Sequence, residues 1–162
     1  MTLHPNRRHS LALLASLAAT ACLPALAAGA RTPMEVWKDP NCGCCKDWVV
    51  LMEKAGFAVT VHDTGNNAVR AKLGLPQRLG SCHTALVGGY LLEGHVPAAD
   101  VRRLLKEKPK ALGLAVPGMP VGSPGMDGPE YGGRKEPYDV LLVTRNLMGS
   151  EVSTQVFTSH RS

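Results

Sequence analysis

The residues best suited to chemistry in this sequence are four cysteine thiols, three of which stand within four positions. The run Asn41-Cys-Gly-Cys-Cys45 supplies Cys42, Cys44 and Cys45, and Cys82 follows about 40 residues later. The clustered thiols begin an expected helix, whose N-terminal N–H groups and positive dipole end favour the thiolate form. The glycine between them permits the tight turn that brings neighbouring sulfurs together. Such a density of thiolates predicts redox chemistry or metal binding.

Three interpretations of these thiols compete. The four cysteines of an exported chain can form two structural disulfides, but one of the three pairings requires a strained bridge between the neighbours Cys44 and Cys45. Cys42 and Cys45 have the C-x-x-C spacing of a thiol-disulfide oxidoreductase, although further thiols beside such a pair invite mispairing. The third interpretation is a metal site, because soft thiolates favour Cu(I), zinc or Fe–S centres.

The cysteine spacing favours a centre with more than one metal ion. Adjacent cysteines have difficulty wrapping one tetrahedral ion, whereas each sulfur can bridge two ions. Zinc normally requires two separated C-x-x-C pairs or a completing histidine, and this sequence lacks that pattern. The thiol-disulfide oxidoreductase stays open as an alternative, and a [2Fe–2S] carrier is a third. We predict a polynuclear thiolate site with the ligands Cys42, Cys44, Cys45 and Cys82.

Two methionines and two histidines are further candidates for the metal site. Met119 and Met126 lie on irregular Gly/Pro-rich sequence with little hydrophobic company, and thioethers prefer Cu(I). His83 follows Cys82 directly, so it is a candidate ligand or a hydrogen-bonding neighbour of a ligand. His95 is a weaker candidate, because a histidine in a turn before a helix is expected to be solvated.

The sequence around these residues alternates strand and helix patterns. The order strand-helix-strand-(helix)-strand-strand-helix predicts an α/β fold, a thioredoxin-like mixed sheet with flanking helices and a C-terminal β-hairpin extension. In that arrangement the loop entering the third strand lies beside the start of the first helix, so Cys82 and His83 should face the Cys42–Cys45 segment. The expected strands span 34–37, 57–61, 84–87 and 90–92, and the expected helices span 44–56, 67–75 and 98–108.

The remainder of the chain divides into a loop and a hairpin. Seven Gly and four Pro between residues 113 and 133 predict a Gly/Pro-rich loop with neither helix nor central strand. Strands at 138–144 and 152–158, with a turn around 146–150, predict a closing hairpin over 138–158. Residues 31–162 are therefore expected to form one domain.

The first thirty residues have the order of a secretory signal peptide: basic, apolar, then small. Arg7 and Arg8 precede the apolar run 11–21, and small residues predict cleavage near 27–30, so that Cys22 is discarded. No apolar run reaches the ~18 residues of a stable membrane span. We therefore expect a periplasmic protein in a compartment where disulfides persist.

The net charge does not indicate nucleic-acid binding. The chain has 18 Lys and Arg against 13 Asp and Glu, but two of the basic residues belong to the signal peptide. No remaining stretch combines clustered basic residues with interleaved aromatic ones. We expect no nucleic-acid partner.

Four motifs of the chain stand out together: Cys42-Gly-Cys-Cys45, Ser81-Cys-His-Thr-Ala85, Glu93-Gly-His-Val-Pro97 and the segment 116–126 that carries Met119 and Met126. Over about residues 34–145, this combination resembles the exported CopG copper-resistance proteins. The resemblance implies a periplasmic, thioredoxin-like protein that works alongside copper efflux and oxidation proteins. It also implies a cysteine-bridged copper cluster with a role in Cu(I)/Cu(II) redox interconversion, in which Cys42, Cys44, Cys45 and Cys82 would be the bridging thiolates.

We combine both lines in one functional hypothesis. The chain is predicted to be an exported copper-binding protein that holds more than one ion, preferably Cu(I), and contributes to copper resistance. Its expected partners are copper ions and other periplasmic copper proteins. The redox role makes it a candidate copper oxidoreductase.

Overall fold

The protein is described by a computed structural model that covers Met1, residues 30–146 and residues 151–161. Residues 2–29, nearly all of the predicted signal peptide, and residues 147–150 at the tip of the closing hairpin fall outside these described residues. The elements, in chain order, are β1 (Thr32–Lys38), α1 (Gly43–Lys54), β2 (Phe57–His62), α2 (Asn67–Leu73), the 3₁₀ helix η1 (Gln77–Leu79), β3 (His83–Val87), β4 (Tyr90–Glu93), α3 (Ala98–Glu107), β5 (Gly113–Ala115), the 3₁₀ helix η2 (Pro129–Tyr131), β6 (Tyr138–Arg145) and β7 (Val152–His160).

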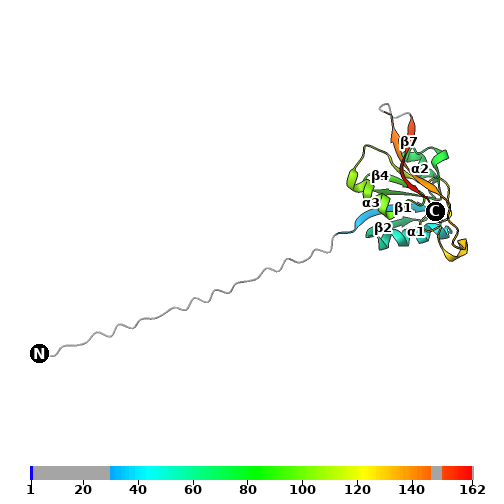
Figure 1. Ribbon diagram of the computed structural model, residues 1–162. Coiled ribbons are helices and arrows are strands. Elements are labelled where there is room, and N and C mark those ends of the chain that lie inside the picture. The colour runs from blue at the N-terminus through cyan, green and yellow to red at the C-terminus, as the bar shows by residue number, and fades with distance from the viewer. Residues whose placement is uncertain (2–29, 147–150, 162) are drawn as a thin grey trace. The chain divides into compact units, whose positions relative to one another are not determined.

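A seven-stranded mixed sheet forms the centre of the domain, in the order β2-β1-β3-β4-β5-β6-β7 (Figure 1). The pairs β1–β2 and β4–β5 are parallel, and the other neighbours are antiparallel. From β1 to α3 the elements other than η1 follow the predicted strand and helix order. The predicted fold class, a mixed α/β sheet with flanking helices and a C-terminal hairpin, is confirmed.

The prediction of a loop without a central strand is wrong for residues 113–115. These three residues form β5, which is buried and pairs with both β4 and β6. A Cβ atom at Gly113 would overlap the backbone of Leu91 on β4. Glycine therefore permits the close approach of the two strands, although its abundance in this segment argued against any strand.

Two hydrophobic clusters lie on opposite faces of the sheet. The first cluster contains Trp48 of α1 and Leu104 of α3, and the second contains Leu79 of η1. On β4 the neighbours Leu91 and Leu92 belong to different clusters, because successive side chains of a strand point to opposite faces. Helices α1 and α3 thus cover one face, and the α2–η1 segment covers the other.

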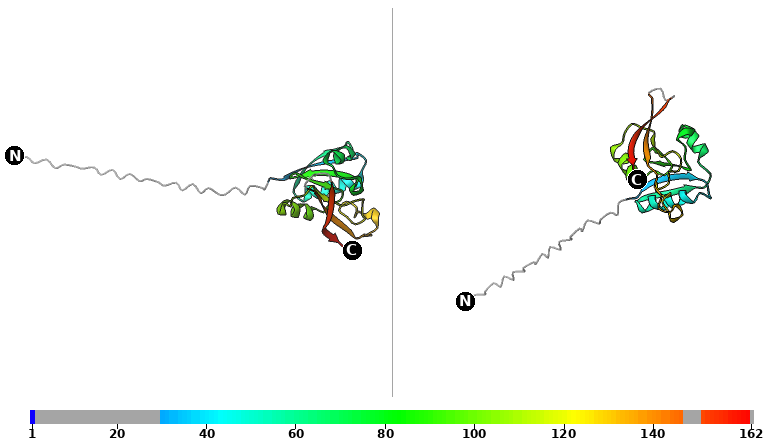
Figure 2. Two further views of the ribbon diagram at one scale, coloured as in Figure 1. Left: turned by 90° about the horizontal axis from the view of Figure 1, so that it is seen from above. Right: turned by 45° about the vertical axis from the view of Figure 1, so that its right-hand side comes forward.

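The C-terminal strands lie at one edge of the sheet and are tied to α3 (Figure 2). Asp100 of α3 accepts hydrogen bonds from the Thr158 hydroxyl (2.6 Å) and from Nε2 of His160 (3.0 Å). The Arg103 guanidinium lies 3.7 Å from the ring centre of Phe157. These contacts attach β7 to the body of the domain.

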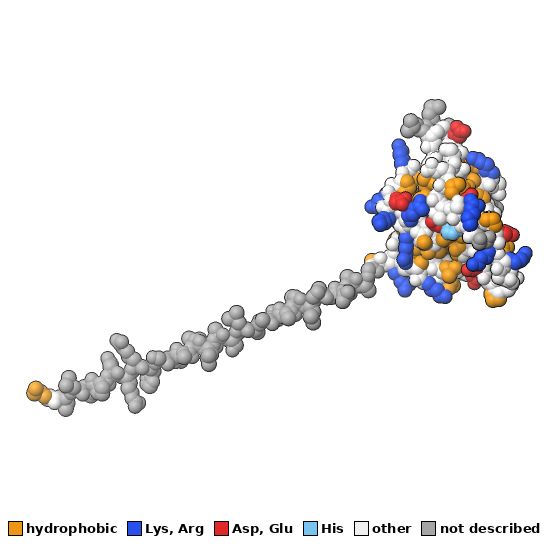
Figure 3. Space-filling view, in the orientation of Figure 1, with side chains coloured by type: hydrophobic (Ala, Val, Ile, Leu, Met, Phe, Trp, Pro, Cys, Tyr) orange, Lys and Arg blue, Asp and Glu red, His pale blue; other side chains and the backbone are white. Residues whose placement is uncertain are grey.

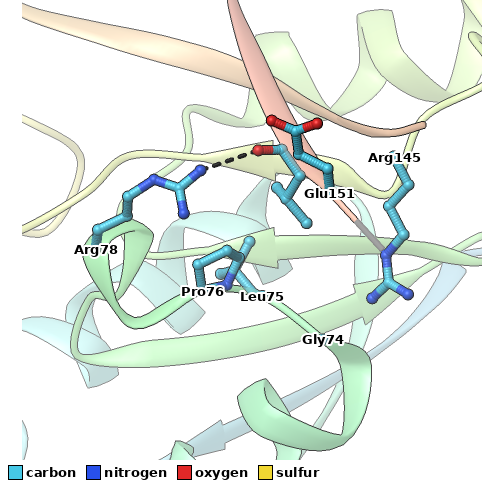
Figure 4. A pocket seen from close by; sticks show the side chains of 7 residues that line it. Gly74, Leu75, Pro76, Arg78, Arg145 and Glu151 are labelled. Atoms are coloured by element: carbon cyan, nitrogen blue, oxygen red, sulfur yellow. Dashed lines mark hydrogen bonds between the residues drawn. The ribbon is translucent and has the colours of Figure 1, made fainter. Parts of the chain in front are cut away.

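A second set of contacts ties the hairpin to the α2–η1 segment. Figure 4 shows Arg78 donating to the backbone carbonyl of Val152, at 2.9 Å. Arg145 of β6 donates to the carbonyl of Leu73 at the end of α2, at 2.5 Å. Both guanidinium groups thus hydrogen-bond to backbone oxygens. They line a hollow between the α2–η1 segment and the β6–β7 hairpin.

The surface is mixed in character. On the face visible in Figure 3, Lys and Arg side chains are scattered around the margin, with hydrophobic side chains between them. In the described part of the chain, none of the helices combines the length and the apolar character that a membrane crossing requires.

Candidate metal centre

Four cysteine sulfurs converge where the start of α1 meets the loop that enters β3. All four Sγ atoms lie within 4.8 Å of one another. The predicted juxtaposition of Cys82 with the Cys42–Cys45 segment is therefore confirmed. Cys45 is fully buried, whereas the other three are partly exposed. We call these residues, Cys42, Cys44, Cys45 and Cys82, the four-cysteine cluster.

Helix α1 places three of these sulfurs at its N-terminus. Cys42 is the N-cap residue, its backbone is extended (φ −70°, ψ 102°), and its carbonyl accepts the first helical hydrogen bond, from the N–H of Lys46. No side chain caps the N-terminal N–H groups, and the first turn carries no acidic residue. The unpaired N–H groups and the helix dipole therefore make this end of the helix electropositive.

The cysteines differ in their covalent state. Cys42 and Cys45 form a disulfide, whereas Cys44 and Cys82 carry free thiols. The Sγ of Cys44 lies 3.6 Å from that of Cys42, and Cys45 Sγ lies 3.7 Å from the carbonyl oxygen of Cys82. The interpretation with two structural disulfides does not describe this arrangement, because only one bridge is present among the described cysteines. Reduction of that bridge would place four thiols in one small volume.

His95 makes a close contact with Cys82. Its Nε2 lies 3.0 Å from the Cys82 Sγ, and its Nδ1 lies 2.8 Å from the carbonyl oxygen of Pro124. A carbonyl oxygen only accepts hydrogen bonds, so in the neutral ring Nδ1 carries the proton and Nε2 presents its lone pair to the thiol. A histidine held in this way has the tautomer that suits a metal ligand.

The expectation of a solvated His95 is wrong. His95 is fully buried, and so is His83 at the start of β3. His83 packs on the ring of Trp48 with 4.4 Å between ring centres, and its Nδ1 lies 3.4 Å from the Cys82 Sγ. Its Nε2 is buried without a hydrogen-bond partner among the described residues. Cys82, His83 and His95 therefore form a second group whose ligand atoms lie within 4.8 Å of one another.

The protonation of this group is set by burial. Burial, followed by the charge of nearby Cys44, raises the pKa of the Cys82 thiol to about 12. Burial also lowers the pKa of His95, and it lowers the pKa of His83 well below the usual value. Cys82 is thus a thiol at neutral pH that donates to a neutral His95, and a metal ion must displace its proton.

Acidification is expected to destabilise the fold through these two histidines. Because their pKa values are lower in the folded chain, the unfolded chain binds more protons below its own pKa of about 6.5. The free energy of unfolding should fall as the pH falls through this window, by up to about 1.4 kcal/mol per pH unit for each histidine. Urea unfolding of the metal-free protein between about pH 7.5 and 5.5 measures the slope.

One variant tests the source of this pH dependence. His95→Gln should remove part of the slope, because one of the two buried histidines is lost. Equal slopes in the wild type and in His95→Gln would contradict the prediction.

The two candidate methionines occupy different environments. Met126 is 7% exposed and its Sδ accepts a hydrogen bond from the Tyr131 hydroxyl at 3.2 Å. Met119 is 51% exposed and lines the same hollow as Cys82. The Ser81 hydroxyl donates to the carbonyl of Gly118, which holds the Met119 backbone against the turn. Met119 and Cys82 thus face the same solvent-accessible space, while the Met126 sulfur has a phenol partner that the sequence did not indicate.

Two solved structures are similar to the chain over most of its length. Both are named copper resistance protein CopG, in forms 1 and 2, and both are 44% identical to it with a TM-score of 0.71. The matches cover 82% and 81% of this chain and 99% of each solved chain. A family model described as a protein of unknown function, DUF411, matches residues 79–126. No curated protein matches the chain.

Proposed function

Because the chain belongs to the CopG family of copper resistance proteins, we propose that it binds copper ions at the four-cysteine cluster. The observation that carries this proposal is the convergence of four sulfurs within 4.8 Å, one of them from a distant part of the chain. Cu(I) is a soft ion that prefers thiolate and neutral imidazole ligands, which are the groups gathered here.

The proposed site holds more than one copper ion. Cys82 belongs both to the four-cysteine cluster and to the group with His83 and His95, and this shared membership supports a bridging role for its sulfur. The neighbours Cys44 and Cys45 are too close along the chain to wrap a single tetrahedral ion comfortably, whereas bridging sulfurs relieve this constraint.

The proposal includes a place and a role for the site. The chain is exported to the periplasm, where the site contributes to copper resistance together with other copper efflux or oxidation proteins. Interconversion of Cu(I) and Cu(II) at the cluster, which the family resemblance implies, would make the protein a copper oxidoreductase. Thiolates stabilise Cu(I), so they would bias this interconversion toward the reduced ion.

An anaerobic titration with Cu(I) tests the proposal. The protein is first reduced, so that the Cys42–Cys45 disulfide is opened. We expect binding to saturate above one equivalent of copper per chain and all four thiols to become protected from alkylation. Saturation at or below one equivalent would contradict a polynuclear site, and no binding at all would contradict the copper function.

A thiol-disulfide oxidoreductase is the second candidate function. The observation that favours it is the Cys42–Cys45 disulfide, which has C-x-x-C spacing at a helix N-terminus. A [2Fe–2S] carrier would instead show visible absorption and iron in protein purified without air.

Cys44→Ser separates the two main candidates. We expect this variant to bind fewer copper ions, because a bridging sulfur is lost, while disulfide exchange by Cys42 and Cys45 stays largely intact. Copper stoichiometry and turnover of a disulfide substrate are measured on the same preparation. An unchanged stoichiometry would exclude Cys44 from the copper site, and turnover in both proteins without copper binding would favour the oxidoreductase.

A further inference from the structure

A buried ion pair lies directly behind the turn that carries Cys82. Arg70 of α2 and Glu93 at the end of β4 are 3% and 0% exposed, and Arg70 Nε donates to Glu93 Oε1 at 2.8 Å. Neither residue belongs to the candidate metal groups. Burying two charges has a large desolvation cost, and hydrophobic residues of similar volume are often equally stabilising. The pair therefore calls for a role beyond stability.

Both members of the pair hydrogen-bond to the backbone of Ser81, the residue before Cys82. Glu93 Oε1 accepts a hydrogen bond from the N–H of Ser81 at 2.7 Å. Arg70 Nη2 donates to the Ser81 carbonyl at 2.6 Å, and this carbonyl belongs to the peptide bond that joins Ser81 to Cys82. Glu93 thus holds the Gly80–Ser81 peptide bond and Arg70 holds the Ser81–Cys82 peptide bond, so two charged side chains fix the backbone that leads into Cys82.

The same hydrogen-bond network also includes Thr84, which lies two residues after Cys82. The second carboxylate oxygen of Glu93 accepts a hydrogen bond from the Thr84 hydroxyl at 2.6 Å. Asn66 Nδ2 lies 3.2 Å from both the Thr84 hydroxyl and the Ser81 carbonyl. The backbone on both sides of Cys82 is therefore held, through Ser81 and Thr84, by Arg70 of α2 and Glu93 of β4.

Glu93 connects this turn to the one that carries His95. Gly94 follows Glu93, and its N–H donates to the carbonyl of His83 at 2.9 Å. A Cβ atom at Gly94 would clash with the Ser81 side chain, so the two turns are in direct contact. The side chain of Glu93 thus holds Cys82 while its backbone leads to His95, whose Nε2 lies 3.0 Å from the Cys82 sulfur.

We propose that Arg70 and Glu93 are positioning residues that set the distance between the Cys82 thiol and the His95 imidazole and thereby the copper affinity of the site. This inference rests on the proposed copper function. The proposed role requires the several donors of the Arg70 guanidinium, since its Nε pairs with Glu93 while its Nη2 donates to the Ser81 carbonyl.

Arg70→Lys is the sharpest test, because lysine retains the charge but lacks the second arm. We expect Cu(I) affinity, measured by competition with a chelator, to fall by about 10- to 100-fold, the usual effect of losing a group that orients a ligand. Glu93→Gln keeps an acceptor for the Ser81 N–H, so it should lose less affinity than Glu93→Ala. Wild-type affinity in Arg70→Lys would show that the pair only balances charge and would overturn the proposal.

Asp100→Asn is the matched control. Asp100 is a second buried carboxylate, 5% exposed, and the side chains that donate to it, Thr158 and His160, belong to β7. This variant should lower the melting temperature and leave the Cu(I) affinity unchanged. An equal loss of affinity in Asp100→Asn and Arg70→Lys would attribute the effect to general destabilisation and overturn the proposal.

A readout without metal separates failure of the inference from failure of the proposed function. In the metal-free protein, whose Cys42–Cys45 disulfide is intact, alkylation of Cys82 should be faster in Arg70→Lys and Glu93→Ala than in the wild type and unchanged in Asp100→Asn. Wild-type protein that fails to bind Cu(I) would contradict the copper function, whereas an unchanged alkylation rate of Cys82 would contradict the positioning role.

Discussion

Replacing Cys82 by serine is expected to weaken Cu(I) binding by at least about 100-fold and to lower the number of ions bound. A four-ligand structural zinc site is worth about 10–16 kcal/mol, and the same share per ligand here is roughly 3 kcal/mol, or about two powers of ten in affinity. Cys82 is also the one residue shared by both candidate metal groups of the described chain. Its loss should therefore affect ions on both sides of a bridging sulfur.

Chelator competition and metal analysis of the reduced protein measure this effect. Serine is nearly isosteric and its hydroxyl can still donate to His95 Nε2, so the fold and the Cys42–Cys45 disulfide should survive the change. Unfolding by urea supplies that control, with a change in unfolding free energy expected to stay within about 1 kcal/mol because Cys82 is partly exposed. If the copper stoichiometry and the fold were both unchanged, Cys82 would not be a copper ligand.

The approach of Cys82 to the other cysteines could be predicted because it follows from the element order and from the thioredoxin-like arrangement that this order resembles. Strand and helix periodicities placed β1, α1, β2, β3, β4 and α3 within a few residues of their observed bounds. In a mixed sheet of this order, the loop before β3 meets the N-terminus of α1. Two short sequence signals, the run Asn41–Cys45 and Cys82, were then enough to locate the cluster.

The burial of His95 and the role of Glu93 could not be predicted by the same reasoning. His95 was expected to be solvated from its turn position, but its burial depends on the segment 113–133 folding over it, with the Pro124 carbonyl as hydrogen-bond partner. Glu93 stood out in the sequence only as part of a motif. One sequence signal was available: Glu93 directly follows the apolar run Tyr90–Leu92, and an acidic residue at the end of a buried strand usually has a cationic partner.

The Gly/Pro-rich segment shows why composition is a weak guide to tertiary contacts. Its glycines indicated a loop, and most of residues 116–137 are irregular, apart from η2. Yet Gly113 lies within β5, because only glycine fits against Leu91. Met126 was expected on an irregular loop with little hydrophobic company, whereas it is buried and accepts a hydrogen bond from Tyr131. Both outcomes depend on long-range packing that local patterns do not encode.

Gly125→Ala is expected to destabilise the fold by roughly 2–6 kcal/mol. Gly125 has a φ of +83°, which costs a residue with a Cβ about 1–3 kcal/mol. The added Cβ would also lie 2.6 Å from the carbonyl oxygen of Cys44 and 2.9 Å from the amide nitrogen of Trp48. Both atoms belong to the backbone of α1 and cannot rotate away, so overpacking adds about 1–3 kcal/mol. Urea unfolding measures the sum.

Gly133→Ala is the control for backbone strain, because Gly133 has a similar φ of +73° but nothing lies within 4 Å of the position that its added Cβ would take. The difference between the two variants isolates the contact with α1, and equal losses would show that this contact is unimportant. Gly125 also follows Pro124, whose carbonyl fixes the tautomer of His95. Pushing the loop away from α1 should therefore weaken Cu(I) binding in Gly125→Ala, while Gly133→Ala binds Cu(I) as the wild type does. Copper affinity would then depend on how closely this loop packs against α1, in addition to the sulfur ligands themselves.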